Sequence, residues 1–446
     1  MMGLANRAAG RTLLVAAALL ALQGCGMFKG GGPKPKTLGE RVSVLDFEKR
    51  VEAEADLQGI EIVLPAAQVN ANWTQPGGSP SGVMGHLALS AQPTQIWSRS
   101  IGKGSDATRR LNATPVIAEN RLFVIDTEGR VSAFDATTGS PLWQKIISVE
   151  GQGTRPAFGG GVSFMDGRVF VTTGFGVAVA LDAGNGAELW RQTLPTPLRG
   201  APGVDAGRVF VTTHDGQLSA LNAETGAISW QANATVEPAA ILGPGGPAIA
   251  QDTVVAGFAS GELFALRVEN GRTVWQDQLA RTGRTTALGA LSGIAASPVI
   301  DRGRVFAIGH GGRMAALELS TGQRVWERDF AGVNTPWAVD DWVFAVTLEG
   351  ELVALTRAEG KIRWVTQLER WRNEKKKTGG IEWFGPVLAG ERLILVSSES
   401  RMVTVAPTTG EIIGTTRLKS SAYLPPVVAN GVLYILTDDG TLTAYR

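Results

Sequence analysis

The sequence is poor in the residues that most often carry chemistry. Its 446 residues include one cysteine, three histidines and three tyrosines. No Cys–His pair, Ser–His–Asp set, HExxH motif or phosphate-binding loop is recognisable. His214 and His310 occupy equivalent turn positions in a repeat described below, which is typical of turn formers rather than metal ligands. The sequence therefore gives no argument for catalysis, a cofactor or a metal.

A strong net charge and a long apolar run are also missing. The formal charge is +1, and removing residues 1–24, which hold Arg7, Arg11 and no acid, gives +1 − 2 = −1. A nearly neutral chain offers no electrostatic case for binding nucleic acid. The apolar run of residues 13–22 is too short to cross a bilayer core of about 30 Å as a helix.

Residues 1–24 have the features of a secretory signal peptide, with basic residues first, the apolar run next and small residues last. They are followed by the only cysteine, in Leu-Gln-Gly-Cys25. This motif resembles the lipobox of bacterial lipoproteins, so we expect a lipidated Cys25. Gly26 in place of Asp favours the outer membrane, on its periplasmic side. The alternative is an ordinary signal peptide with an incidental cysteine.

From residue 95 onward one pattern recurs, most clearly in LSALNAETGAISW (218–230). Related copies stand at 131–143, 177–190, 263–275, 314–326, 352–364 and, more weakly, 402–414, where Gly414 replaces the final tryptophan. From residue 97 to residue 414 there are 317 residues in seven intervals, or about 45 per interval, which is typical of propeller blades. The pattern ends in Trp97, Trp143, Trp190, Trp230, Trp275, Trp326 and Trp364.

Each part of the repeat predicts a structural element. The alternating Leu-x-Ala-Leu predicts a half-buried strand, and Thr-Gly or Asn-Gly supplies the positive φ of a tight hairpin. The tryptophan that follows is expected to dock each blade on its neighbour. We predict an all-β, eight-bladed propeller over residues 95–446, with four antiparallel strands per blade. Its first strand would complete the last blade and close the ring.

The segments before the propeller are less regular. Residues 25–37, with Gly30-Gly31-Gly32-Pro33, are expected to form a flexible, basic tether behind the lipidated cysteine. Residues 38–94 form an N-terminal extension. Trp73 within it is expected to pack on the propeller as a plug rather than to serve as a ligand platform.

The long insertions all fall in the crossings from one blade to the next, at Lys145–Ala157, Asp277–Ala295 and Gln367–Phe384. Because the turns on the opposite face are short, the crossing face is the expected binding face. Trp371 and Arg372 lie in the charged run of the third insertion. We expect them to contact a partner, and a solvated loop is the alternative.

The lipobox, the tether, WTQPGG (73–78) and the eight repeats together resemble the BamB family of lipoproteins. This resemblance implies a non-enzymatic, monomeric scaffold that binds the POTRA repeats of BamA within the outer-membrane β-barrel assembly (BAM) complex. It also assigns partner binding to Leu198, Arg199 and Gly200, on the crossing into the third blade. The alternative is that Leu198 is buried and Arg199 merely exposed. The segment 289–296 lacks the acidic residues that relatives carry there.

Two other classes share the repeat. Pyrroloquinoline-quinone dehydrogenases resemble it, but they place adjacent cysteines and a calcium site over the channel, and this chain has no second cysteine. A propeller that binds a small ligand or a glycan in its channel is the third possibility, because the sequence does not identify the residues that line the channel.

Overall fold

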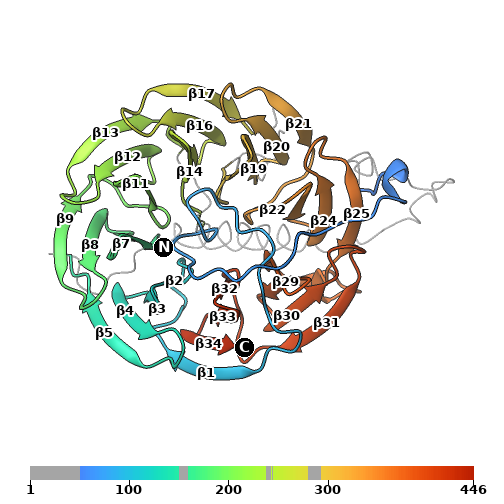
Figure 1. Ribbon diagram of the computed structural model, residues 1–446, viewed down its shortest axis with the longest axis horizontal. Helices are drawn as coiled ribbons and strands as arrows, with labels where there is room; N and C mark the ends of the chain where they lie inside the picture. Colours follow the sequence, from blue (N-terminus) through green and yellow to red (C-terminus); the bar gives the residue numbers. More distant parts are fainter. Residues whose placement is uncertain (1–50, 150–158, 238–242, 244, 280–292) are drawn as a thin grey trace, which may run out of the picture. The chain divides into compact units, whose positions relative to one another are not determined.

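The computed structural model describes residues 51–149, 159–237, 243, 245–279 and 293–446. Val51–Arg446 form one compact unit, an eight-bladed β-propeller (Figure 1). The signal peptide, Cys25 and the tether lie outside the described residues. The prediction of an all-β propeller with eight blades of four antiparallel strands is confirmed.

The strands follow one another around the ring, with the innermost strand of each blade first. Blades one to four are β2 (Val116–Ala118), β3 (Arg121–Ile125), β4 (Arg130–Asp135), β5 (Pro141–Ile146); β6 (Gly160–Met165), β7 (Arg168–Thr173), β8 (Val177–Asp182), β9 (Glu188–Thr193); β10 (Gly203–Asp205), β11 (Arg208–Thr212), β12 (Gln217–Asn222), β13 (Ile228–Asn233); and β14 (Ala248–Ala250), β15 (Thr253–Gly257), β16 (Glu262–Arg267), β17 (Thr273–Gln278). Blades five to seven are β18 (Val299–Asp301), β19 (Arg304–Gly309), β20 (Arg313–Glu318), β21 (Arg324–Arg328); β22 (Trp337–Val339), β23 (Trp342–Val346), β24 (Glu351–Thr356), β25 (Ile362–Gln367); and β28 (Trp383–Ala389), β29 (Arg392–Ser397), β30 (Arg401–Val405), β31 (Ile412–Arg417).

The eighth blade joins the two ends of the propeller. It contains β32 (Val427–Ala429), β33 (Val432–Leu436), β34 (Thr441–Tyr445) and β1 (Gln95–Ser100). β1 pairs antiparallel with β34, in the register Ser98↔Thr443. The ring is therefore closed by hydrogen bonds between the first and the last strand, which leaves no open end at the closure.

Seven tryptophans link adjacent blades at seven of the eight junctions of the ring. Trp190 donates its indole N–H to the carbonyl of Ala223 at 2.9 Å, and its ring lies on Gly226 of the hairpin turn. Gly226 has φ +73°, and a Cβ built on it would lie 2.6 Å from the indole. Glycine is therefore required twice, for the turn and for the close approach. The other indole-to-carbonyl pairs, at 2.7–3.2 Å, are Trp97–Ala136, Trp143–Ala183, Trp230–Val268, Trp275–Leu319, Trp326–Arg357 and Trp364–Pro407.

The same arrangement explains the missing tryptophan at Gly414. This residue lies on β31 of blade seven, which faces blade eight. The last two strands of blade eight, β34 and β1, come from opposite ends of the propeller and are not joined by a hairpin. Blade eight therefore has no Thr-Gly turn at this place, and an indole at position 414 would lack its docking site.

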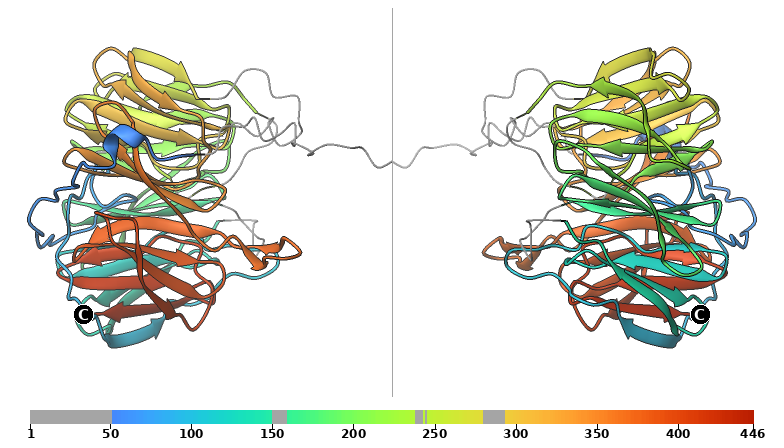
Figure 2. Two further views of the ribbon diagram at one scale, coloured as in Figure 1. Left: turned by 90° about the vertical axis from the view of Figure 1, so that its right-hand side faces the viewer. Right: turned by 90° about the vertical axis from the view of Figure 1, so that its left-hand side faces the viewer.

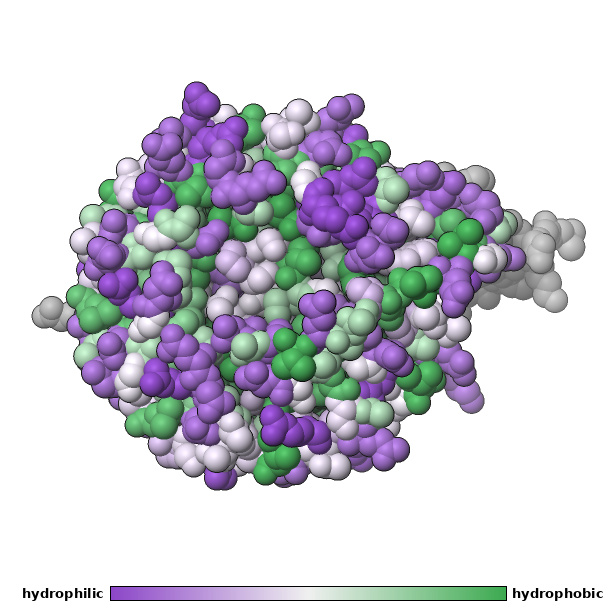
Figure 3. All heavy atoms as spheres, viewed as in Figure 1, coloured by the Kyte–Doolittle hydropathy of each residue, from purple (hydrophilic) through white to green (hydrophobic). Residues whose placement is uncertain are grey.

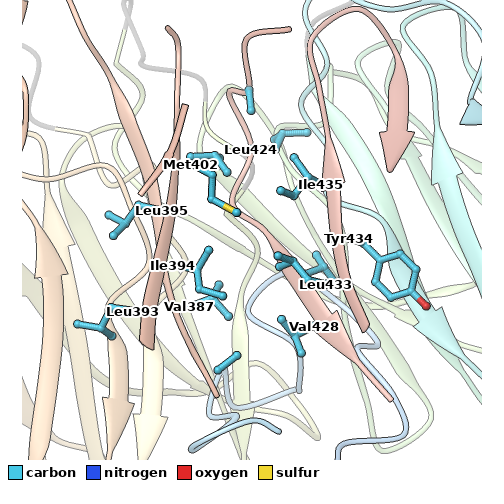
Figure 4. Close-up of a cluster of buried hydrophobic side chains, with 14 of the residues drawn as sticks. Val387, Leu393, Ile394, Leu395, Met402, Leu424, Val428, Leu433, Tyr434 and Ile435 are labelled. Atoms are coloured by element: carbon cyan, nitrogen blue, oxygen red, sulfur yellow. The ribbon is translucent and has the colours of Figure 1, made fainter. Parts of the chain in front are cut away.

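The core lies between the blades. Figure 4 shows Val387, Ile394 and Leu395 of blade seven opposite Leu433 and other apolar residues of blade eight. These residues belong to one buried cluster that also includes Trp73 and Leu87 of the N-terminal extension. Removing apolar surface from water contributes about 25 cal/mol per Å², so these interfaces hold the ring together.

The described part of the N-terminal extension starts at the rim of the propeller. A 3-10 turn, η3 (Ala55–Leu57), follows Glu54, whose backbone N–H binds the carbonyl of Ile362 at 2.8 Å. Lys361 forms an ion pair with Asp56 at 2.9 Å. The extension then crosses the face that carries the short turns. The hairpin formed by β26 (Trp371–Asn373) and β27 (Thr378–Gly380) lies on the opposite side (Figure 2). Hydrophilic and hydrophobic residues are interspersed over that face (Figure 3).

Residues 68–88, here called the strap, pass over the central channel and contact every blade. In seven blades the strap forms a hydrogen bond with a backbone group of the innermost strand, and the bonded residue stands at the equivalent position of each of these strands. In the sixth blade the carbonyl of Gly85 in the strap accepts a hydrogen bond from the Trp337 indole at 2.9 Å. These inner edges would otherwise present unpaired backbone groups, which are costly when buried. Five of these bonds join backbone to backbone, and in the other two the strap uses the side-chain oxygen of Gln75 and the side-chain nitrogen of Asn70. The seven pairs, at 2.7–3.1 Å, are Trp73–Ile117, Thr74–Phe164, Gln75–Val204, Pro80–Ile249, Ser81–Ile300, Leu87–Leu388 and Asn70–Val428.

Two side chains fix the strap in place. Trp73 is 3% exposed and stacks on Trp337, with ring centroids 6.3 Å apart. His86 is buried, its Nδ1 lies 2.8 Å from the Pro65 carbonyl, and its Nε2 accepts the backbone N–H of Glu391 at 2.9 Å. The strap is thus an integral part of the propeller that covers one end of the channel, with Trp73 as the plug that the sequence suggested.

The docking glycine can be tested by comparing two substitutions. We expect Gly226→Ala to lower the free energy of unfolding by about 3 kcal/mol, because it adds a clash with Trp190 to the strain of positive φ. Gly207→Ala is the matched control, since Gly207 has φ +70° but no neighbouring atom within 4 Å of the position that a Cβ would take. Its loss should be only about 1 kcal/mol. Equal losses in urea unfolding would contradict the docking role.

A second pair of variants tests the strap. We expect Trp73→Ala to destabilise the protein by about 3 kcal/mol, as for other buried aromatic residues. It should also make the segment 51–94 sensitive to proteolysis. Val69, 68% exposed within the same strap, is the control, and Val69→Ala should change neither property. A Trp73→Ala protein with unchanged thermal unfolding and proteolysis would show that the strap contributes little to stability.

Candidate functional site

The candidate site is the crossing face, where one blade leads to the next. Two of the three predicted insertions, Lys145–Ala157 and Asp277–Ala295, lie partly outside the described residues. The third is described in full and contains a two-stranded hairpin, β26 (Trp371–Asn373) and β27 (Thr378–Gly380). This hairpin projects from the propeller on the side away from the strap (Figure 2).

The segment Leu198–Gly200 lies between blades two and three and is buried. Leu198 is fully buried and forms an isolated bridge with Thr213. The backbone N–H of Arg199 binds the Thr212 carbonyl at 2.9 Å, and the hydroxyl of Thr172 donates to the Gly200 carbonyl at 2.8 Å. The three residues therefore complete the packing between two blades.

The side chain of Arg199 is also buried, with 5% of its surface exposed. Its guanidinium reaches toward the fourth and fifth blades, 3.3 Å from the carbonyl oxygen of Ile294 and 3.5 Å from that of Gly257. Burial lowers the pKa of Arg199 below its usual value. The sequence suggested that Arg199 either binds a partner or is merely exposed, and neither alternative included this burial. In the isolated chain the side chain connects the crossing before blade three with Gly257 and Ile294, so little of its surface is available to a partner.

The hairpin is exposed and held firmly at its base. Arg372, with a side chain 65% exposed, forms an ion pair with Glu399 at 3.1 Å. Trp371 is half-buried, and the guanidinium of Arg370 lies 5.3 Å from its ring centroid. The indole of Trp383 donates to the carbonyl of Glu369 at 2.8 Å. Of the predicted partner-binding residues, Trp371 and Arg372 are thus the accessible ones.

Next to the base of this hairpin the channel opens into a cavity of about 380 Å³. Its apolar wall includes Leu348, Ile381, Trp383 and Phe384. A smaller cavity of about 50 Å³ lies next to it and is bounded by Trp73 of the strap, and the two cavities have four lining residues in common. The shared residues are Gly245, Asn334, Thr335 and Pro425.

Two of the cavity residues lie at turns of the repeat, where the pattern indicated His310 only as a turn former and gave no role to Leu348. His310 and Leu348 occupy equivalent turns of neighbouring blades, and both line the cavity. Leu348 is 41% exposed, which is unusual for a large apolar side chain at a tight turn. An apolar residue at a turn position was the signal that could have located the channel mouth.

Metal-binding groups and membrane-spanning helices were looked for in the described residues. In these ranges no group of three or more His, Cys, Asp or Glu side chains is arranged to hold a metal ion. Within the same ranges no helix has the length and apolarity needed to cross a membrane.

The architecture defines the class as an eight-bladed propeller of quinoprotein-like repeats, and comparison with known proteins defines the family. The family described as "Outer membrane protein assembly factor BamB" matches residues 77–157, 128–366 and 368–446. The BamB of Escherichia coli (strain K12) is 31% identical over 354 residues, which span 78% of this chain and 88% of that protein. This chain belongs to the BamB family, and the resemblance seen in the sequence is confirmed.

Solved structures support the fold. The crystal structure of BamB from Moraxella catarrhalis aligns with a TM-score of 0.67 at 21% identity, over 80% of this chain and all of that one. A quinohemoprotein alcohol dehydrogenase from Comamonas testosteroni aligns with a TM-score of 0.65 at 15% identity, over 85% and 81% of the chains. Because an enzyme shares the fold, the fold alone does not determine the function.

Substitution of Arg199 tests its burial in solution. Arg199→Glu would place a carboxylate against the carbonyl oxygens of Ile294 and Gly257, so we expect a loss of about 3 kcal/mol in unfolding free energy. Arg199→Lys keeps a cationic donor and should lose about 1 kcal/mol. Both values follow from urea unfolding. An Arg199→Glu protein as stable as the wild type would mean that this side chain faces water.

Proposed function

We propose that the protein is a non-enzymatic scaffold in the assembly of outer-membrane proteins, and that it docks on the POTRA repeats of BamA within the BAM complex. Membership of a family named for outer membrane protein assembly is the observation that carries this proposal. The absence of any paired cysteine, which the sequence already showed, is consistent with a scaffold rather than a quinoprotein dehydrogenase.

We place the docking surface on the crossing face. The exposed hairpin with Trp371 and Arg372 supplies an aromatic residue and an arginine, which are enriched among residues that dominate binding energy. The docking surface also depends on the buried residues Leu198, Arg199 and Gly200, because their packing positions the crossings between blades two and five. The lack of acidic residues in 289–296 agrees with a contact centred on the hairpin.

Attachment to the membrane is the second part of the proposal. The lipobox predicts a lipid on Cys25, and residues 26–37 would tether the propeller on the periplasmic side of the outer membrane. A single lipid-modified terminus with a flexible linker leaves the propeller free to orient toward its partner.

Co-purification from detergent-solubilised outer membranes tests the proposal. The tagged wild type is expected to bring down a large β-barrel protein with POTRA repeats. The double variant Trp371→Ala/Arg372→Glu should reduce its recovery about tenfold, since it removes an anchor and reverses a charge.

Arg272→Glu is the matched control, because it reverses an exposed charge in a hairpin turn on the opposite face. Its recovery should equal that of the wild type. Arg199→Lys belongs in the same series, because Arg199→Glu would confuse loss of binding with loss of stability. If the wild type brings down no β-barrel protein, the scaffold function is wrong; equal recovery with all variants would refute only the docking surface.

A further inference from the structure

The hairpin and the cavity beside it form one continuous surface of mixed chemistry. The tip of the hairpin carries Lys375, Lys376 and Lys377, all exposed and without an ion pair among the described residues. β27 leads from this tip directly to Ile381, which is 7% exposed and lines the cavity. A cationic turn is thus connected through three residues of strand to an apolar recess.

The hairpin is preorganised rather than free to collapse into the recess. The backbone N–H of Lys376 binds the side chain of Asn373 at 3.0 Å and closes the turn. At the base, the N–H of Ile381 binds the Arg370 carbonyl at 2.9 Å. A surface that is already ordered loses less entropy when a partner binds, which favours a defined contact.

The recess has the properties of a pocket for one large apolar side chain. Its volume of about 380 Å³ is near the lower end of the range of about 300–1,000 Å³ typical of ligand sites. Trp383 and Ile381 line it, and Leu348 lies partly exposed at its edge. Phe384 continues this surface to Tyr423, 5.7 Å away between ring centroids, and Arg110 covers the Tyr423 ring at 5.1 Å.

The charge around the recess selects the partner. Residues 369–382 hold five basic residues and three acidic residues, a net charge of 5 − 3 = +2. Two of the three acids are Glu369, which pairs with Arg401, and Glu382 in the cavity lining. The third, Glu374, lies in the tip beside the lysines. The tip therefore carries a net charge of 3 − 1 = +2, which attracts carboxylates.

We propose that the lysine tip and the cavity together bind an acidic segment of a partner protein, with one aromatic or large aliphatic side chain in the cavity and flanking carboxylates on Lys375–Lys377. This inference rests on the proposed function for the nature of the partner, a protein of the assembly apparatus. A protein segment fits better than a lipid surface. The tip, Asn373–Thr378, has no apolar residue to enter a bilayer, and the apolar residues are recessed behind it.

The test uses the full mature chain and a labelled ten-residue peptide with a central phenylalanine between aspartates. Fluorescence anisotropy should detect binding that weakens with salt. Lys375→Glu/Lys376→Glu should weaken it about tenfold, and Leu348→Asp should weaken it about as much, because each removes one half of the recognition. Arg272→Glu on the opposite face should leave the affinity unchanged, and circular dichroism of each variant verifies folding.

Two further peptides complete the test. Replacing phenylalanine by serine, or the aspartates by lysines, should abolish binding. Equal affinity for all three peptides, or equal affinity of all variants, would overturn the proposal. So would binding of phosphatidylglycerol vesicles that depends on Lys375 and Lys376 without any peptide binding, because the tip would then recognise a membrane.

The same variants separate this inference from the proposed function. Recovery of the β-barrel protein by the wild type without any peptide binding would leave the scaffold function standing and refute the acidic segment. Peptide binding with the expected losses, but with no β-barrel protein recovered, would support the site and refute the scaffold function.

Discussion

The contact of an indole with a glycine of the next blade is the interaction on which the ring depends. Each tryptophan needs a neighbour with a positive-φ turn that lacks a side chain, and each turn needs a glycine for its own conformation. Hairpin and blade packing are therefore specified by the same two residue types. Where the closing blade replaces the hairpin by strands from the two chain ends, the requirement disappears, and Gly414 takes the place of tryptophan.

This coupling explains why the fold was predictable from the sequence. A residue that serves two requirements recurs at fixed spacing, so the blades and the composite closure can be counted from the sequence alone. The strap was not predictable in the same way. Its bonds join residues 68–88 to eight strands spread over more than three hundred residues, and its own sequence has no repeat that indicates this path.

The site was predictable in part. The crossing face, with the half-buried Trp371 and the exposed Arg372, was a candidate because of the position of the insertions. The burial of Arg199 did not, because its guanidinium meets carbonyls 58 and 95 residues later in the chain. Local sequence shows the charge of an arginine but not whether distant crossings enclose it. The cavity likewise is formed by several crossings, and the only sign of it in the sequence was Leu348, an apolar residue at a turn position.

The strap and β1 also determine when the native structure can be completed. Both lie at the start of the propeller chain, yet they bond to every blade and to the last strand, β34. Contacts of such large sequence separation pay a high loop-closure entropy before they are formed, which slows folding. During synthesis the strap and β1 therefore cannot complete their hydrogen bonds until the last blade has been made. Until then the incomplete ring exposes strand edges, and it is in this interval that the chain is most open to aggregation.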